Sequence, residues 1–227
     1  MKLADLKVIY ICPDHNEKYH ARKLHMDNLL ATIGFTDVHH YKSSTENYPA
    51  CLIKATIDIL QSNMDHPFLL LEDDVDWTGG HEFDLDPSAD AIYFGLSKCG
   101  GSATNDGSAG GSKYTDHSET HVRIQNMLSA HAIFYISQRY KQAVVNTLTP
   151  YISISYYNDV LISRIQSQYM VLGQKQPFFY QSSKFNSSDI EERATKIQIS
   201  PVLWSPHLRM LPKRVQRPAA VLRMSAF

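Results

Sequence analysis

Residues 68–74 read FLLLEDD, so that four apolar residues lead directly into three acidic ones. A continuous apolar run of this length is typical of a strand that is buried on both faces of a sheet. The carboxylates of Glu72, Asp73 and Asp74 would therefore leave the sheet together at the end of that strand. Adjacent carboxylates repel one another unless a cation or hydrogen-bond donors compensate them. This stretch predicts a central strand with a candidate site at its end.

Strands and helices are expected to alternate on both sides of this stretch. Further strands are predicted over residues 6–12, 37–41, 91–96, 131–136, 169–172 and 178–180. Helices are predicted over residues 17–33, 49–63, 139–148 and 157–168. Alternation of this kind predicts an α/β fold: a single three-layer α/β/α domain over residues 1–227, with a mostly parallel central sheet.

Two segments do not fit this alternation. Residues 100–112 read GGSATNDGSAGGS and contain no large apolar side chain, so we expect a flexible loop. That loop is either a surface excursion or a lid over an active site. Residues 201–227 contain four prolines and are expected to form a basic, irregular tail.

Composition excludes several classes of protein. Hydrophobic residues make up 43% of the chain, which argues against wholesale disorder, and a net charge of -1 argues against a surface that binds nucleic acid throughout. The charge is nevertheless unevenly distributed. Residues 72–90 hold eight carboxylates and no Lys or Arg, whereas residues 193–227 hold seven Lys or Arg and no acid. We expect the carboxylates from Glu82 to Asp90 to form a solvated connection.

The three cysteines, Cys12, Cys51 and Cys99, include no CxxC pair, so neither a zinc site nor a disulfide framework is expected. Charges at Asp5 and Lys7 interrupt the first apolar residues, unlike a signal peptide. No apolar run approaches the roughly 20 residues of a membrane span. We therefore expect a soluble, cytoplasmic protein with no integral membrane segment.

Polar residues also follow the first predicted strand, where Asp14 and Asn16 come directly after Pro13. Ligands of open α/β sheets bind beyond the carboxyl ends of the strands, so these residues and the three acids are expected at the same edge. Clustered carboxylate oxygens suit Mg2+ or Mn2+, and Mg2+ is commonly held by one or two carboxylates together with phosphate oxygens. The alternative is an acidic turn that is simply solvated.

FLLLEDDVDW resembles the DxD-type motif of GT-A glycosyltransferases, in the form where Glu-Asp-Asp ends an apolar strand. Over roughly residues 6–181 the order of segments is similar to glycosyltransferase family 25, the lipooligosaccharide and collagen galactosyltransferase type. The similar segments are VIYIC, YPACLIKATIDIL, DAIYFGL, SAHAIFYISQRYKQAVV and YNDVLISRI followed by PFFYQ. A short chain of this kind would suit a viral or bacteriophage member.

This resemblance implies an enzyme that moves a sugar from a nucleotide-diphosphate donor, such as a UDP- or GDP-sugar, to an acceptor hydroxyl. The acceptor would be a glycan, a lipid-linked glycan or a protein glycan, and inversion is the family expectation. By resemblance, Asp74 would bind Mn2+ or Mg2+, and Glu72 and Asp73 would position the ribose or a metal-bound water.

The resemblance also implies roles at two other places in the chain. Asp14, Asn16 and Arg22 would contact the nucleotide base and ribose. Asp159 would accept the proton of the acceptor hydroxyl, because it lies in the segment that matches the family's closing Asp-containing helix. Its alternative role is that of a carboxylate favoured at a helix N-terminus by the helix dipole. His131 would either contact sugar hydroxyls or simply pack in the core.

Two other functions remain open from the sequence. The acidic cluster could serve a metal-dependent phosphoesterase or nuclease, with Asp14 and Asp159 as further ligands. The chain could also be a non-catalytic module that binds a nucleotide or a glycan.

Overall fold

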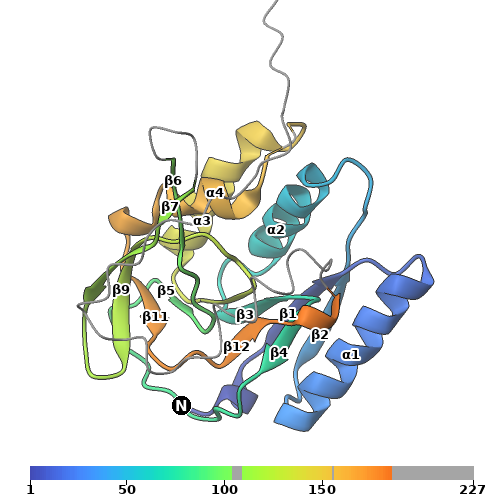
Figure 1. Ribbon diagram of the computed structural model, residues 1–227, viewed down its shortest axis with the longest axis horizontal. Coiled ribbons are helices and arrows are strands. Elements are labelled where there is room, and N and C mark those ends of the chain that lie inside the picture. The colour runs from blue at the N-terminus through green and yellow to red at the C-terminus, as the bar shows by residue number, and fades with distance from the viewer. Residues whose placement is uncertain (104–108, 155, 186–227) are drawn as a thin grey trace, which may run out of the picture.

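The computed structural model describes residues 1–103, 109–154 and 156–185 (Figure 1). Their main feature is an eight-stranded sheet. In sheet order its strands are β2 (Val38–Lys42), β1 (Val8–Cys12), β3 (Phe68–Glu72), β10 (Ala132–Tyr135), β5 (Ala91–Tyr93), β11 (Val171–Gln174), β9 (His121–Asn126) and β8 (Lys113–Asp116). Within this sheet the pairings give six strands one direction, and β10 and β9 the opposite one. The prediction of an α/β fold is confirmed, and the sheet is mixed.

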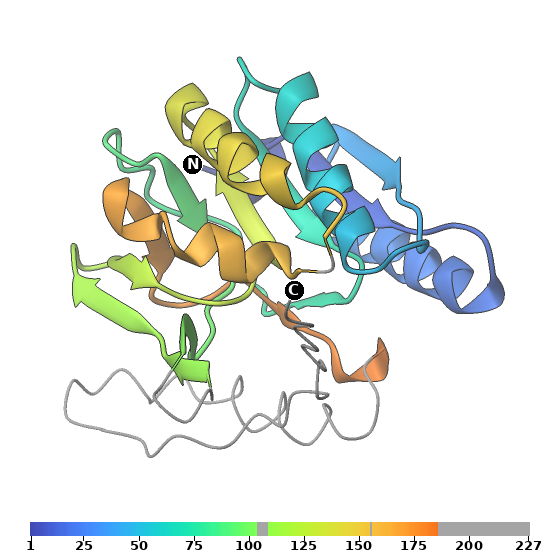
Figure 2. The same cartoon turned by 90° about the horizontal axis from the view of Figure 1, so that it is seen from above.

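Helices lie on both faces of the sheet. They are α1 (Glu17–Ile33), α2 (Ala50–Ser62), α3 (Gln138–Leu148), α4 (Asn158–Ser163) and the short 3-10 helices η1 (Leu3–Asp5), η2 (Thr149–Tyr151), η3 (Gln166–Gln168) and η4 (Ser183–Phe185). α2 and α3 lie side by side on one face, together with α4 (Figure 2). α1 packs on the other face, where β12 (Phe179–Gln181) pairs with β4 (Val75–Trp77).

The alternation of side chains in β1 explains the three layers. All five residues of this strand are buried. Ile9 and Ile11 belong to the core under α2, α3 and α4, whereas Val8 and Tyr10 belong to the core under α1. A strand buried on both faces requires a helix layer on each side.

The helices predicted over residues 17–33 and 139–148 agree with α1 and α3. The Asn16 side chain accepts a hydrogen bond from the Tyr19 N–H and caps α1, which ends at Gly34 with a φ of 93°. Ser137 caps α3 in the same way. The helix predicted over residues 157–168 is shorter, because α4 ends at Ser163 and the chain continues into η3.

The described parts of the segment 100–112 include paired strands. Residues predicted as a flexible loop contribute to a two-stranded sheet, in which β6 (Cys99–Ala103) pairs with β7 (Ala109–Gly111). Glycine permits this close pairing, since a Cβ at Gly100 would lie 2.3 Å from the carbonyl oxygen of Gly111. Residues 104–108 and the basic tail predicted over residues 201–227 lie outside the described residues.

Asp90 also departs from the expectation of a solvated acidic connection, because its side chain is buried. Arg139 donates to both carboxylate oxygens, from Nε at 2.6 Å and from a terminal nitrogen at 2.7 Å, and the Met170 N–H donates at 2.8 Å. Burial alone would raise the pKa of Asp90, but these hydrogen bonds and that of Ser137 lower it. Asp90 thus joins β5 to α3 and to the start of β11.

We expect Asp90→Asn to lower the free energy of unfolding at neutral pH by about 2 kcal/mol, the typical contribution of hydrogen bonds to a buried charge. Because the native pKa is lowered, this stabilisation is present above the unfolded-state pKa and is lost as the pH falls through the native one. Urea unfolding should therefore show a difference in the free energy of unfolding between the two proteins at pH 7, and this difference should become smaller in acid. A difference in the free energy of unfolding that is the same at every pH would contradict the stabilising role of the Asp90 charge.

None of the helices in the described part of the chain combines the length and the apolar composition that crossing a bilayer requires.

Candidate functional site

The acidic residues stand where β3 ends and the chain turns into β4. Asp73 and Asp74 are buried, and Glu72 is partly exposed. The Ser182 N–H, just after β12, donates to the Asp74 carbonyl oxygen at 2.5 Å. The backbone on both sides of the turn is thus fixed by sheet pairing, which gives the three carboxylates defined positions.

The electrostatics of this cluster reflect crowded negative charge. Burial, and then the charges of Asp74, Asp159 and Asp73, raise the pKa of Glu72 well above its ordinary value. Burial and the charge of Asp73 likewise raise the pKa of Asp74 to about 6, although Arg22 opposes the shift. A positive charge placed here would relieve this repulsion.

Arg22 supplies part of that compensation from α1. One of its terminal nitrogens donates to Asp73 Oδ1 at 2.6 Å, and the other donates to the Phe185 carbonyl oxygen at 2.8 Å. Both side chains of the Arg22–Asp73 pair are nearly buried, with 13% and 10% of their surface exposed. The pair therefore joins the first helix directly to the acidic turn.

The oxygen atoms that remain unpaired fit a divalent cation. Among the described residues, Asp73 Oδ2 and Asp74 Oδ1 are buried without a hydrogen-bond partner. No group of three or more His, Cys, Asp or Glu side chains in the same residues is arranged to hold a metal by itself. One or two carboxylates suffice for Mg2+ when substrate phosphates supply further ligands, so the two orphaned oxygens match that mode of binding.

Asp159 approaches the same end of β3 from α4. The Glu72 N–H donates to the His131 carbonyl oxygen at 3.0 Å, and Ser129, two residues before His131, binds Asp159. Asp159 Oδ2 accepts from the Ser129 N–H at 3.1 Å, and its Oδ1 accepts from the Val160 N–H at 2.8 Å. Burial raises the pKa of Asp159 despite these hydrogen bonds, and its charge in turn raises that of Glu72. The fold thus brings together the two acidic segments that the sequence singled out separately.

Ser129 also belongs to this candidate site, although it was not predicted from the sequence. Its φ of 100° lies in the left-handed region, which is uncommon for a residue other than glycine. This conformation directs its N–H to Asp159 while its hydroxyl hydrogen-bonds His131 Nδ1. Backbone outliers of this kind cluster at functional sites, but no local sequence pattern signals this one.

His131 occupies a packed position. It is buried, and burial lowers its pKa to about 4, so the ring is neutral at pH 7. Gly95 makes room for it, since a Cβ there would lie 1.7 Å from His131 Nε2. The structure therefore favours the packing role for this histidine.

Asp14 and Asn16 lie at the end of β1, as predicted. Asn16 caps α1, and Asp14 pairs with His20 at 3.0 Å and, more distantly, with Lys42 at 3.9 Å. Arg22, the third residue predicted to contact the nucleoside, reaches the acidic turn through its hydrogen bond to Asp73. Contact of Asp14 and Asn16 with a nucleoside stays a prediction.

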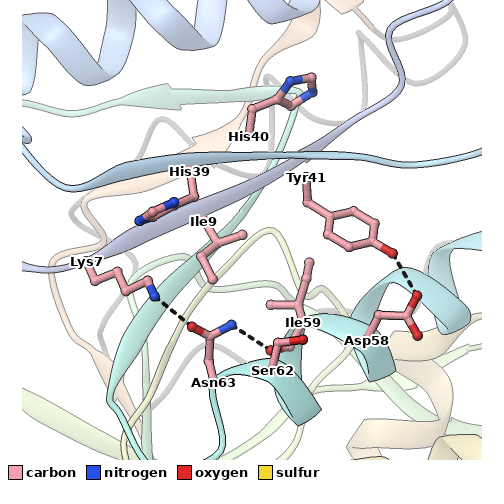
Figure 3. A pocket seen from close by; sticks show the side chains of 9 residues that line it. All are labelled: Lys7, Ile9, His39, His40, Tyr41, Asp58, Ile59, Ser62 and Asn63. Carbon is pink, nitrogen blue, oxygen red and sulfur yellow. Dashed lines mark hydrogen bonds between the residues drawn. The ribbon is translucent and has the colours of Figure 1, made fainter.

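A separate pocket of about 190 Å³ lies between β1, β2 and α2 (Figure 3). Four of its polar side chains form two hydrogen-bonded pairs: Lys7 donates to Asn63 at 2.8 Å, and Tyr41 donates to Asp58 at 2.8 Å. Paired groups of this kind support the wall of the pocket, and no residue of the acidic cluster lines it. We therefore place the candidate site at the end of β3.

The fold and the site together define an α/β protein with a mixed sheet and a carboxylate cluster at the end of a central strand. No family model matches the sequence, and no curated protein matches it.

Several solved structures, including the following two, are similar to this chain. One is the CTP:phosphocholine cytidylyltransferase LicC from Streptococcus pneumoniae, with a TM-score of 0.42 and 10% identity over 82% of this chain and 98% of that one. The other is a UTP-bound UGPase from Acinetobacter baumannii, with a TM-score of 0.42 and 12% identity over 85% of this chain and 77% of that one. Neither assigns a family, and the function proposed below rests on the residues of the site.

Proposed function

We propose that this protein is a metal-dependent glycosyltransferase that moves a sugar from a UDP- or GDP-sugar to a hydroxyl group of a glycan acceptor. The observation that carries this proposal is that the 129–131 segment hydrogen-bonds both Glu72, at the end of β3 beside Asp73 and Asp74, and Asp159, at the start of α4. The resemblance of the acidic segment to the DxD-type motif supports it.

The acidic turn and Arg22 would bind the donor diphosphate. Asp74, with its orphaned Oδ1, and Asp73, with its orphaned Oδ2, would hold Mn2+ or Mg2+. When bound, the ion neutralises charge on the departing diphosphate. Arg22 would exchange part of its interaction with Asp73 for a phosphate oxygen, because guanidinium groups suit both partners. Glu72 would orient the ribose, and Asp14 and Asn16 would contact the nucleoside.

Asp159 would take the proton from the acceptor hydroxyl. Its raised pKa brings it closer to neutrality, where a general base is most effective. The backbone donors of Ser129 and Val160 each engage one carboxylate oxygen, which orients the group and leaves further lone pairs for a substrate. Attack by an acceptor on the face opposite the diphosphate would invert the anomeric centre.

A thermal-shift screen of UDP and GDP, each with and without Mn2+, tests this function. Stabilisation by one nucleotide only together with Mn2+ is expected, and it should approach about 2.7 kcal/mol at a ligand concentration of 100 Kd. Incubation with the matching nucleotide sugars should then release free nucleotide. Phosphodiester cleavage with metal alone would instead indicate a nuclease, and nucleotide binding without turnover would indicate a binding module.

We expect Asp159→Asn to keep the nucleotide–Mn2+ thermal shift and to lower kcat about 10²- to 10⁴-fold, the usual contribution of a general base. Asp37→Asn is the matched control, because Asp37 is an exposed aspartate that pairs with His39 on the surface. Its kcat should equal that of the wild type. Normal turnover by Asp159→Asn would remove Asp159 as the base.

A further inference from the structure

Two tyrosines stand exposed beside the acidic cluster. Tyr48 is 63% exposed and Tyr157 is 52% exposed, although large apolar side chains are usually covered. Tyr48 precedes Pro49, the N-cap of α2, and Tyr157 is the N-cap residue of α4, two positions before Asp159. Segments far apart in the sequence therefore place two aromatic rings at the same edge of the site.

The two rings form one unit. Their centroids are 6.3 Å apart and their planes are inclined at 75°, an edge-to-face arrangement that is favourable for aromatic pairs. Such an arrangement leaves ring surface of each tyrosine open to solvent. An exposed and mutually ordered aromatic pair is suited to binding a ligand with an apolar face.

The charges around the pair restrict that ligand. Tyr157 lies two positions before Asp159, and the contact between the two rings holds Tyr48 beside the segment that carries this carboxylate. Carboxylates accept hydrogen bonds from hydroxyl groups and repel anions. The positive charge of Arg22 is held at Asp73 and the Phe185 carbonyl, which makes that side the favourable one for a diphosphate.

We propose that Tyr48 and Tyr157 form the acceptor subsite and that they bind a neutral pyranose ring. A pyranose presents a face of C–H groups, which would pack on the tyrosine rings, and a rim of hydroxyls, which would donate to the carboxylates. Because Tyr157 lies two residues before Asp159, a pyranose bound to it would have one of its hydroxyls close to this base. The catalytic part of this inference rests on the proposed function, whereas sugar binding by the pair does not.

Binding of simple glycosides tests the subsite directly. The probes are the neutral methyl β-glycosides of galactose, glucose and N-acetylglucosamine, with the methyl glucuronide as an anionic comparison, followed by saturation-transfer NMR and titration. We expect at least one neutral glycoside to bind more tightly than the glucuronide. Tyr48→Ala and Tyr157→Ala should each weaken that binding about tenfold, and Tyr157→Phe should retain it.

Two controls separate the possible results. Leu85→Ala removes another exposed apolar side chain, 44% exposed, and should leave glycoside binding unchanged. The nucleotide–Mn2+ thermal shift should be the same in both alanine variants as in the wild type. If the tyrosine variants lose that shift and keep glycoside binding, the pair binds the nucleobase and the proposal is overturned.

The subsite and the enzymatic function fail in different ways. No saturation transfer from any neutral glycoside to the wild type, or equal binding by wild type and Tyr48→Ala, overturns the subsite. Absence of any nucleotide–Mn2+ shift or turnover overturns the glycosyltransferase, while glycoside binding that depends on Tyr48 and Tyr157 would still uphold the sugar-binding pair.

Discussion

The substitution Asp74→Asn is expected to abolish sugar transfer and, at the same time, to stabilise the ligand-free protein. Loss of a metal-binding oxygen at the departing diphosphate should cost several kcal/mol of transition-state stabilisation, which corresponds to about a thousandfold in kcat or more. Stabilisation follows because burial and the charge of Asp73 oppose ionisation of Asp74 in the folded state. Asparagine has a similar shape and carries no charge.

The pH dependence of this stabilisation has a definite sign. The pKa of Asp74 is raised from 3.8 to about 6, so the folded protein binds this proton more tightly than the unfolded chain does. Raising the pH through that interval therefore lowers the free energy of unfolding of the wild type. The decrease is up to about 3 kcal/mol, at about 1.4 kcal/mol per pKa unit. Asp74→Asn does not undergo this ionisation. Its stability relative to the wild type should therefore increase between about pH 4 and pH 6 and then stay constant.

Urea unfolding of the wild type and Asp74→Asn across this pH range measures the effect. Asp116→Asn serves as the control, because Asp116 is an 84% exposed carboxylate that pairs with Lys175. Its stability should stay within about 0.5 kcal/mol of the wild type. An Asp74→Asn protein that is less stable than the wild type at pH 7, or one that transfers sugar normally, would contradict the site as described.

The substitution Lys141→Met is expected to cause the largest loss of stability. Lys141 lies on α3 with its side chain fully buried, and its ammonium group donates to the carbonyl oxygens of Asn63, Met64 and His66 at 2.9, 3.0 and 2.6 Å. These carbonyls belong to the chain just after α2. Methionine would fill the space and leave the carbonyls without this donor.

Hydrogen bonds to a charged group contribute roughly 1.5 to 3 kcal/mol each, and their loss is offset by the desolvation of the ammonium group that is no longer required. We therefore expect a net loss of about 2 to 4 kcal/mol, and a Tm lower by roughly 10 °C for a chain of this size. Calorimetry of the variant measures both quantities.

Lys54→Met provides the matched control for this substitution. Lys54 is a 62% exposed lysine on α2 that pairs with Asp58 four residues further along. Exposed pairs of this kind contribute little, so this variant should melt within a few degrees of the wild type. Equal Tm values for the two methionine variants would show that Lys141 does not stabilise the end of α2.

Much of the fold was predictable from short-range signals. The apolar run at residues 68–71 identified the central strand, and the helices predicted over residues 17–33 and 139–148 correspond to α1 and α3. β8 and β9 were missed because residues 113–126 are mostly polar and partly exposed, which gives little of the periodicity by which strands are recognised. The reversed direction of β10 also has no local signal, since the direction of a strand follows from the path of the connecting chain.

Within the site, the sequence alone determined that Glu72, Asp73 and Asp74 follow a buried strand, because hydrophobic burial and chain continuity place them there. Only the tertiary structure decided that Asp159 would reach the same cluster, that Arg22 would pair with Asp73, and that Tyr48 would meet Tyr157. The physical reason is that these contacts join segments on different helices and loops. Their formation depends on how α1, α2 and α4 pack on the two faces of the sheet, and no pattern within one segment encodes that packing.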